Sequence, residues 1–290
     1  RRDAYPRKTR IIDLDRGQGA IAEQASCRSR PDPVHKSCLV PLVMLTAMTY
    51  EGAGSAALTG AGCRRPVLVV GGTGYVGAPL CQYLSAGGYG VTAASRSTEL
   101  TFDDPRIGRV RMDVFSPETV NQFQRYRTAV ICPWIEHDDQ TASRQWIDRL
   151  ARQLVETGAR SLIYLSSMWV YGGESQEFLT ETTPVAPTSS YGSAHASNEA
   201  ALVEIAGELG ADLTILRMAN LVGPDPFYAF RTKTAFAHEL LEMALLDRLI
   251  ILRSAPSTPR NLLPRSLFHH DVEKLIARPQ IEGRVDIFNL

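Results

Sequence analysis

The sequence lacks a net charge of either sign. Its 290 residues contain 31 lysines and arginines and 31 aspartates and glutamates, so the formal net charge at pH 7 is zero. A strong basic excess would favour binding to nucleic acid or to an anionic membrane, and this balance argues against both partners. We therefore expect neither nucleic acid nor a membrane as partner.

Cysteine is scarce and shows no ligand-like spacing. The five cysteines form no C-x-x-C pair and no metal-binding pattern with histidine: Cys27, Cys38, Cys63, Cys81 and Cys132. Structural zinc sites need such clusters, so we expect no metal. Scattered cysteines are also typical of a reducing compartment, and we expect a cytoplasmic protein.

Long hydrophobic runs are missing as well. The most apolar stretch, residues 38–50, is too short to span a membrane and is interrupted by Pro41. The N-terminal part up to about residue 62 shows neither helical nor strand periodicity, and the chain begins with Arg1 rather than methionine. We predict that residues 1–64 are a disordered or extraneous N-terminal extension.

Regular patterns begin at residue 65. Six runs of residues are candidate strands, at 67–70, 90–94, 109–112, 129–132, 162–166 and 213–217. Helical spacing of apolar residues marks segments between them, as at 146–157 and 191–209. This alternation predicts an α/β fold, with a Rossmann-type doubly wound parallel sheet over residues 65–220. The loops and helix that follow predict a small substrate-binding lobe over residues 221–290.

The first apolar run leads into a glycine-rich turn. Residues 71–77 fit both G-x-G-x-x-G and G-x-x-G-x-x-G, and helical spacing follows them. Glycine lets the backbone approach a pyrophosphate, which then meets the positive end of the helix. A purely structural glycine turn is the alternative. We predict that this turn binds a dinucleotide through Gly71, Gly72, Thr73, Gly74, Tyr75, Val76 and Gly77.

The end of the second run bears on the choice of dinucleotide. An NAD site would place Asp or Glu there, about twenty residues past the glycine turn, but the chain has Ser95 and Arg96. A guanidinium suits the 2′-phosphate of NADP, so we predict NADP, with NAD less favoured. A solvated Arg96 is the alternative. Asp113 and Val114, which follow the third run, belong to the predicted cofactor-binding set, which also includes Tyr191 and His195.

Three further motifs follow in order along the chain. They are Ser-Ser-Met-Trp-Val-Tyr-Gly at 166–172, Tyr-Gly-Ser-Ala-His at 191–195 and Leu-Arg-Met-Ala-Asn-Leu-Val-Gly-Pro at 216–224. With the glycine turn, this set resembles the extended short-chain dehydrogenase/reductase family, the NAD(P)-dependent epimerases and dehydratases. The family motifs are G-x-x-G-x-x-G, S-S-x-x-V-Y-G, Y-x-x-x-K and L-R-x-x-N-x-x-G-P.

This resemblance covers roughly residues 65–290 and implies an activity. It implies hydride transfer at a carbonyl or hydroxyl group of a small molecule or nucleotide sugar, as a reduction, an epimerisation or a dehydration. It also implies a possible homodimer. Relatives continue beyond the position of Leu290, so the resemblance implies a substrate lobe that is incomplete at its C-terminal end.

The resemblance also assigns roles to individual residues. Tyr191 would be the general acid/base, and Ser167 would hydrogen-bond and orient the substrate oxygen. Met168, Asn220 and Arg265 would contact the substrate, because Arg265 falls within one position of the arginine that holds the substrate phosphates in the family.

The resemblance breaks at His195, where the family has lysine. That lysine lowers the pKa of the tyrosine and holds the nicotinamide ribose. His195 lies one helical turn after Tyr191, on the same face, but an imidazole with a reference pKa of about 6.5 is mostly neutral at pH 7. Three interpretations stay open: a partly charged substitute for lysine, a slower or altered reaction, and cofactor binding without turnover. The last would make the chain an NADP(H)-binding regulatory or scaffolding protein.

Overall fold

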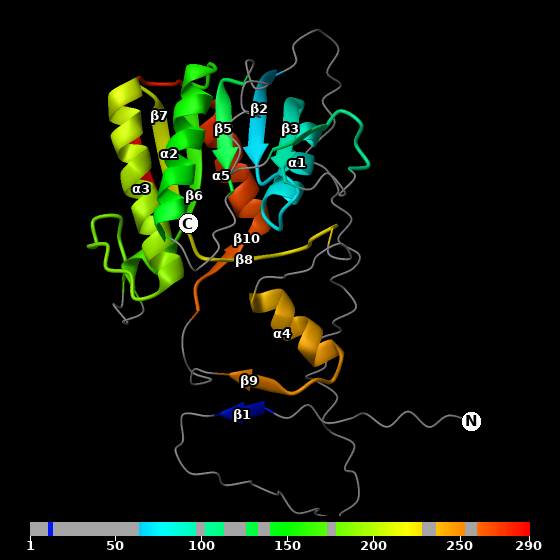
Figure 1. Cartoon of the computed structure of the whole chain (residues 1–290). Helices are drawn as coiled ribbons and strands as arrows, with labels where there is room; N and C mark the ends of the chain where they lie inside the picture. Colours follow the sequence, from blue (N-terminus) through cyan, green and yellow to red (C-terminus); the bar gives the residue numbers. More distant parts are fainter. Residues whose placement is uncertain are drawn as a thin grey trace, which may run out of the picture.

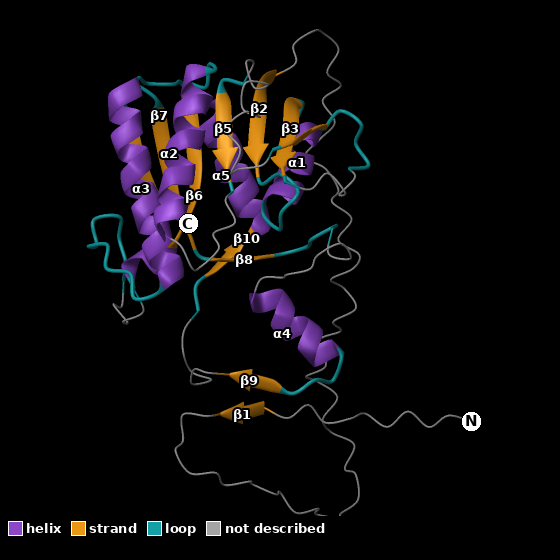
Figure 2. Ribbon diagram, in the orientation of Figure 1, coloured by secondary structure: helices purple, strands orange, loops and turns teal. Residues whose placement is uncertain are grey.

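The computed structural model describes residues 11–13, 64–96, 102–112, 126–132, 140–172, 178–227, 236–252 and 260–290. Seven strands there form one parallel sheet in the order β11-β7-β6-β5-β2-β3-β4 (Figures 1 and 2). Their bounds are β2 Arg64–Val70, β3 Tyr89–Ser95, β4 Gly108–Arg111, β5 Thr128–Ile131, β6 Ser161–Ser167, β7 Asp212–Met218 and β11 Val285–Asn289. The predicted doubly wound parallel sheet is confirmed, and every predicted strand is present.

The strand order reverses at the centre of the sheet. From β2 the chain adds β3 and β4 on one side, and then returns to add β5, β6 and β7 on the other. Ligands of open α/β sheets bind beyond the carboxyl ends of the strands at such a switch point. A ligand-binding site is therefore expected at the loops after β2 and β5.

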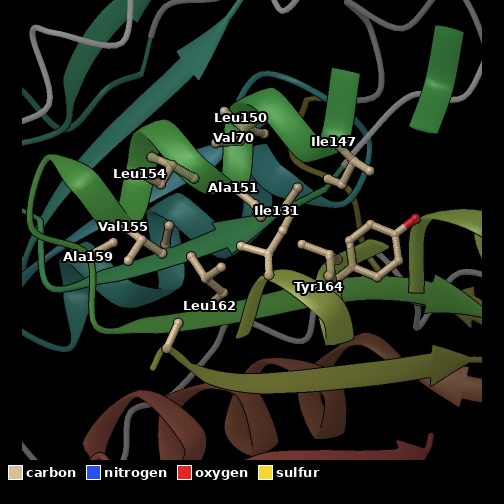
Figure 3. Close-up of a cluster of buried hydrophobic side chains, with 14 of the residues drawn as sticks. Val70, Ile131, Ile147, Leu150, Ala151, Leu154, Val155, Ala159, Leu162 and Tyr164 are labelled. Atoms are coloured by element: carbon tan, nitrogen blue, oxygen red, sulfur yellow. The ribbon is translucent and has the colours of Figure 1, made fainter. Parts of the chain in front are cut away.

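Two layers of helices cover the sheet. The helices α2 (Gln140–Glu156) and α3 (Ser190–Leu209) lie against one face, and α1 (Gly77–Ala86) and α5 (Arg265–Ala277) against the other (Figure 1). Alternate residues of each strand point into opposite layers, so Leu68 and Val70 join the first core and Val67 and Val69 the second. Figure 3 shows the first core, in which α2 covers Val70, Ile131, Leu162 and Tyr164.

Local signals set the ends of α3. Its N-cap residue, Ser189, is extended and accepts a hydrogen bond from the Gly192 amide at 3.1 Å, and Gly210 ends the helix in the left-handed conformation at φ 69°. The motif that follows β6 forms a short 3-10 helix, η3 (Met168–Tyr171), which leads toward α3. These two boundaries place Ser167 and Tyr191 at the same end of the sheet.

The C-terminal part only partly forms a separate lobe. The strands β8 (Asn220–Val222) and β10 (Leu262–Pro264) pair with each other, and α4 (Phe236–Leu245) lies outside the main sheet (Figure 1). In contrast, α5 and β11 return to the sheet, where β11 pairs with β7 in parallel. The boundary predicted at residue 220 therefore does not separate all of 221–290 from the nucleotide-binding fold.

A short strand lies in the predicted N-terminal extension. Residues Ile11–Asp13 form β1, which pairs in parallel with β9 (Ile250–Leu252). Both strands contain consecutive isoleucines, which favour extended structure, but three residues are too few to stand out in a sequence pattern. Apart from β1 and Arg64, the predicted extension lies outside the described residues.

Candidate active site

The glycine turn lies at the switch point, and its positions 71 and 77 have no room for a side chain. A Cβ on Gly71 would stand 2.2 Å from the Cys132 carbonyl oxygen, and one on Gly77 would stand 2.3 Å from the Gly71 carbonyl oxygen. Gly71 also has a φ of 76°, which favours glycine. The turn is thus held against the end of β5 by backbone contacts that only glycine permits.

The remaining positions of the turn leave the start of α1 open. Gly72 packs against Ala93, whereas Gly74 is exposed. Val76 is the N-cap of α1 and provides no side-chain cap, and no acidic residue stands in the first turn to neutralise the helix dipole. An uncapped helix start without an acidic residue would suit a pyrophosphate, and binding of one here stays a prediction.

The end of β3 lies directly against the turn. The amides of Gly71 and Gly72 donate to the Ala94 carbonyl oxygen at 2.8 and 3.1 Å. Ser95 is buried and Arg96 is exposed, so the guanidinium stands at the surface two residues from that contact. Asp113 and Val114 lie outside the described residues.

Ser167 and Tyr191 are brought together at the end of β6. Burial raises the pKa of Tyr191, and a hydrogen bond with Ser167 acts in the opposite direction. The close packing depends on Gly192, where a Cβ would stand 2.3 Å from the Trp169 carbonyl oxygen. That glycine brings the first turn of α3 onto η3, a role that its place in the sequence does not reveal.

His195 is buried beneath the same pair. It is 2% exposed, and its ring lies edge-on to the Tyr191 ring with 4.6 Å between the centroids. Its Nδ1 is 2.9 Å from the Tyr164 hydroxyl, and burial lowers its pKa to about 3. A neutral imidazole at pH 7 does not fit the interpretation in which His195 carries part of the positive charge of a lysine.

A buried ion pair lies next to these residues. Arg217 and Glu199 are 4% and 5% exposed, and Nη2 of the arginine is 2.7 Å from Oε2 of the glutamate. Ser166 donates to the same carboxylate at 2.5 Å, and Arg217 also donates to the Tyr171 hydroxyl at 2.8 Å. Sequence reasoning missed this group; its only sequence signal is a charged residue inside an apolar strand, at Arg217.

The residues predicted to bind substrate do not all gather with Tyr191. Met168 directly follows Ser167, at the start of η3. Asn220 starts β8, and its side chain donates to the Asn261 carbonyl oxygen at 3.1 Å. Arg265 is buried over the glycine turn, with its guanidinium 4.5 Å from the centre of the Tyr75 ring and Nη1 donating to the Tyr75 carbonyl oxygen at 2.9 Å.

The described ranges have neither a cluster of metal-ligating side chains nor a helix suited to a membrane. They contain no cluster of three or more histidine, cysteine, aspartate or glutamate side chains that could hold a metal ion. None of the helices in those ranges has the length and apolar character needed to cross a membrane.

Comparison with known proteins places the chain in a family. A sequence model of the NAD dependent epimerase/dehydratase family matches residues 67–252, and the chain belongs to that family. The match confirms the resemblance that the motifs indicate.

Individual relatives are more distant. UDP-arabinose 4-epimerase 1 of Arabidopsis thaliana is 27% identical over 183 residues, which are 55% of this chain and 44% of that protein. The chain thus matches less than half the length of this relative. UDP-glucose 4-epimerase of Thermotoga maritima, solved with UDP-glucose, superposes with a TM-score of 0.67 at 21% identity, over 78% of this chain and 76% of that one.

A third neighbour was solved with a dinucleotide. UDP-glucuronic acid 4-epimerase of Bacillus cereus, in complex with UDP-glucuronic acid and NAD, superposes with a TM-score of 0.62 at 20% identity, over 77% of this chain and 76% of that one. At these identities the two solved structures establish the fold alone.

Proposed function

We propose that the chain uses a nicotinamide dinucleotide to transfer hydride to or from a carbon that bears oxygen, with Tyr191 exchanging the proton at that oxygen. The observation that carries this proposal is the hydrogen-bonded pair of Ser167 and Tyr191 at the end of β6. Only β5 separates that strand from β2 and its glycine turn. A proton-transfer group and a phosphate cradle therefore share one edge of the sheet.

The dinucleotide would be held by residues 71–77 and the end of β3. When bound, its nicotinamide ring supplies or accepts the hydride. We propose NADP as the preferred form because Arg96, rather than a carboxylate, follows β3. The variant Arg96→Asp should shift the ratio of NADPH to NADH affinities toward NADH. An unchanged ratio, measured by calorimetry, would count against this role of Arg96.

The protonation states favour one direction of reaction. Burial raises the pKa of Tyr191, and the neighbouring His195 is neutral at pH 7, so the phenol keeps its proton. A protonated phenol can donate to the oxygen of a carbonyl as hydride reaches the carbon, whereas accepting a proton from an alcohol would first require phenolate. Reduction of a carbonyl is therefore the direction that the site supports best.

A nucleotide sugar that carries a carbonyl group is the substrate class we propose. The named relatives are UDP-sugar epimerases. Arg265 lies over the glycine turn, where we place the pyrophosphate of the dinucleotide, so its charge does not by itself indicate a second diphosphate.

The neutral state of His195 also supports a second candidate. Without a cation beside Tyr191, the chain could bind the dinucleotide and lack turnover, as a regulatory or scaffolding protein does. Incubation with NADPH and a panel of carbonyl compounds and nucleotide sugars, from pH 6 to pH 9, tests turnover. If activity appears only in His195→Lys, the natural site binds without catalysing; if that variant loses activity, His195 takes part in the chemistry.

A further inference from the structure

A chain of buried side chains stands behind His195. It starts at Ser143 on α2, passes through Asn198 on α3 and Tyr164 on β6, and ends at the imidazole. Asn198 and Tyr164 are fully buried, and His195 is 2% exposed. Bulk water therefore does not replace these hydrogen bonds.

The bonds along this chain have a direction. The amide nitrogen of Asn198 donates to the Tyr164 hydroxyl at 3.2 Å. Because that bond occupies a lone pair of the phenol oxygen, the phenol proton is left to donate to another acceptor. The acceptor within reach is Nδ1 of His195, at 2.9 Å.

This direction favours one position for the proton of the imidazole. Burial raises the pKa of the Tyr164 phenol and lowers that of His195 to about 3, so both groups are neutral at pH 7. A neutral imidazole has one N–H group. If Nδ1 accepts from Tyr164, the proton is on Nε2.

The Nε2–H group would then need a hydrogen-bond acceptor. It is buried and makes no hydrogen bond within the described part of the chain. A buried donor without an acceptor is costly, which is why such groups usually have a role in binding or catalysis. The two nitrogens of an imidazole face different directions, so Nε2 faces away from Tyr164.

We propose that Tyr164 and Asn198 are positioning residues that hold His195 as its Nε2–H tautomer, so that it presents a neutral hydrogen-bond donor to the bound dinucleotide. This inference rests on the proposed function, because the acceptor for Nε2–H is a ribose hydroxyl oxygen of the cofactor. His195 would thus replace the hydrogen bond of the family's lysine without replacing its charge.

The test has a spectroscopic part that needs no ligand. Nitrogen-15 NMR of the whole chain distinguishes a protonated imidazole nitrogen from an unprotonated one, and His195→Gln identifies the signals of this residue among the six histidines. At pH 7 the wild-type protein should show unprotonated Nδ1 and protonated Nε2. A protonated Nδ1 would overturn the proposal, whatever happens to any variant.

The second part uses Tyr164→Phe, which removes only the phenol hydroxyl. The Nε2–H tautomer should lose its dominance, and the Kd for NADPH should rise by about 3- to 10-fold, the usual range for one hydrogen bond. The matched control is Tyr126→Phe, which removes a hydroxyl that bonds Thr92 at 2.7 Å, near the opposite end of the sheet. The control should change neither the tautomer nor the Kd.

The outcomes separate this inference from the proposed function. If wild-type protein binds neither NADPH nor NADH, the proposed function fails, while the NMR signals still report the tautomer. If wild type binds but Tyr164→Phe keeps both the tautomer and the Kd, Tyr164 is not a positioning residue.

Discussion

Replacing Arg217 with methionine should destabilise the protein strongly. Arg217→Met keeps most of the apolar stem but leaves the Glu199 carboxylate buried without its cation. The pair is 2.7 Å apart, with side chains only 5% and 7% exposed, so little water can replace the lost charge. Removing one partner of such a pair typically lowers the free energy of unfolding by about 3–5 kcal/mol. For a chain of this size, that corresponds to a fall in Tm of roughly 6–20 °C.

The same substitution at an exposed pair provides the control. Arg144 is 2.6 Å from Glu204, a similar distance, but these side chains are 40% and 66% exposed. An exposed pair contributes about 0.2–1 kcal/mol, so Arg144→Met should have a small effect. The assay is urea unfolding followed by circular dichroism, with the slopes compared to confirm that the same transition is measured.

Two results would refute this reasoning. The first is an equal decrease in the free energy of unfolding for Arg217→Met and Arg144→Met, because burial of the ion pair would then not determine the size of the decrease. The second concerns the double variant Glu199→Leu with Arg217→Met, which removes both charges and should recover much of the loss. A double variant as unstable as the sum of the single ones would show that lost packing, rather than an isolated charge, is responsible.

Two further predictions concern the glycine turn and the buried His195. Gly71→Ala should lower the free energy of unfolding by about 2 kcal/mol or more and weaken NADPH binding, because its Cβ would stand 2.2 Å from the Cys132 carbonyl oxygen. Gly207→Ala is the control: its Cβ would have nothing within 4 Å, so the free energy of unfolding measured in urea should stay unchanged or rise. The pKa of His195 is about 3 in the folded protein, below its unfolded value of about 6.5. Between these two pH values the unfolded chain binds one more proton than the folded one, so the free energy of unfolding should fall as pH drops from 6.5 toward 3. His195→Gln should reduce this pH dependence, and the exposed His270→Gln is its control; equal slopes for all three proteins would contradict the buried, neutral state of His195.

Most of the predicted strands were predictable because they are short apolar runs between polar or glycine-containing segments, although β4 contains two arginines. The glycine turn was predictable for a similar reason, since its phosphate cradle is contained within seven consecutive residues. Local patterns of this kind depend little on distant parts of the chain. The addition of β11 to the sheet depends instead on pairing with β7, which no local pattern encodes.

The charge of His195 and the buried ion pair could not be predicted from the sequence. The spacing places Tyr191 and His195 on one helix face, but the charge of His195 depends on its burial. Its hydrogen bond is made with Tyr164, which is 31 residues earlier. The ion pair of Glu199 and Arg217 likewise joins a helix to a strand. Both are consequences of packing between elements, which sequence spacing does not specify.

Calorimetric titration of the intact chain with NADPH, and separately with NADH, tests the central claim most directly. The proposed site predicts one dinucleotide per chain, with tighter binding of NADPH and clearly weaker binding to Gly71→Ala, if circular dichroism shows that this variant is folded. Folded wild-type protein that binds neither dinucleotide would contradict the proposed site.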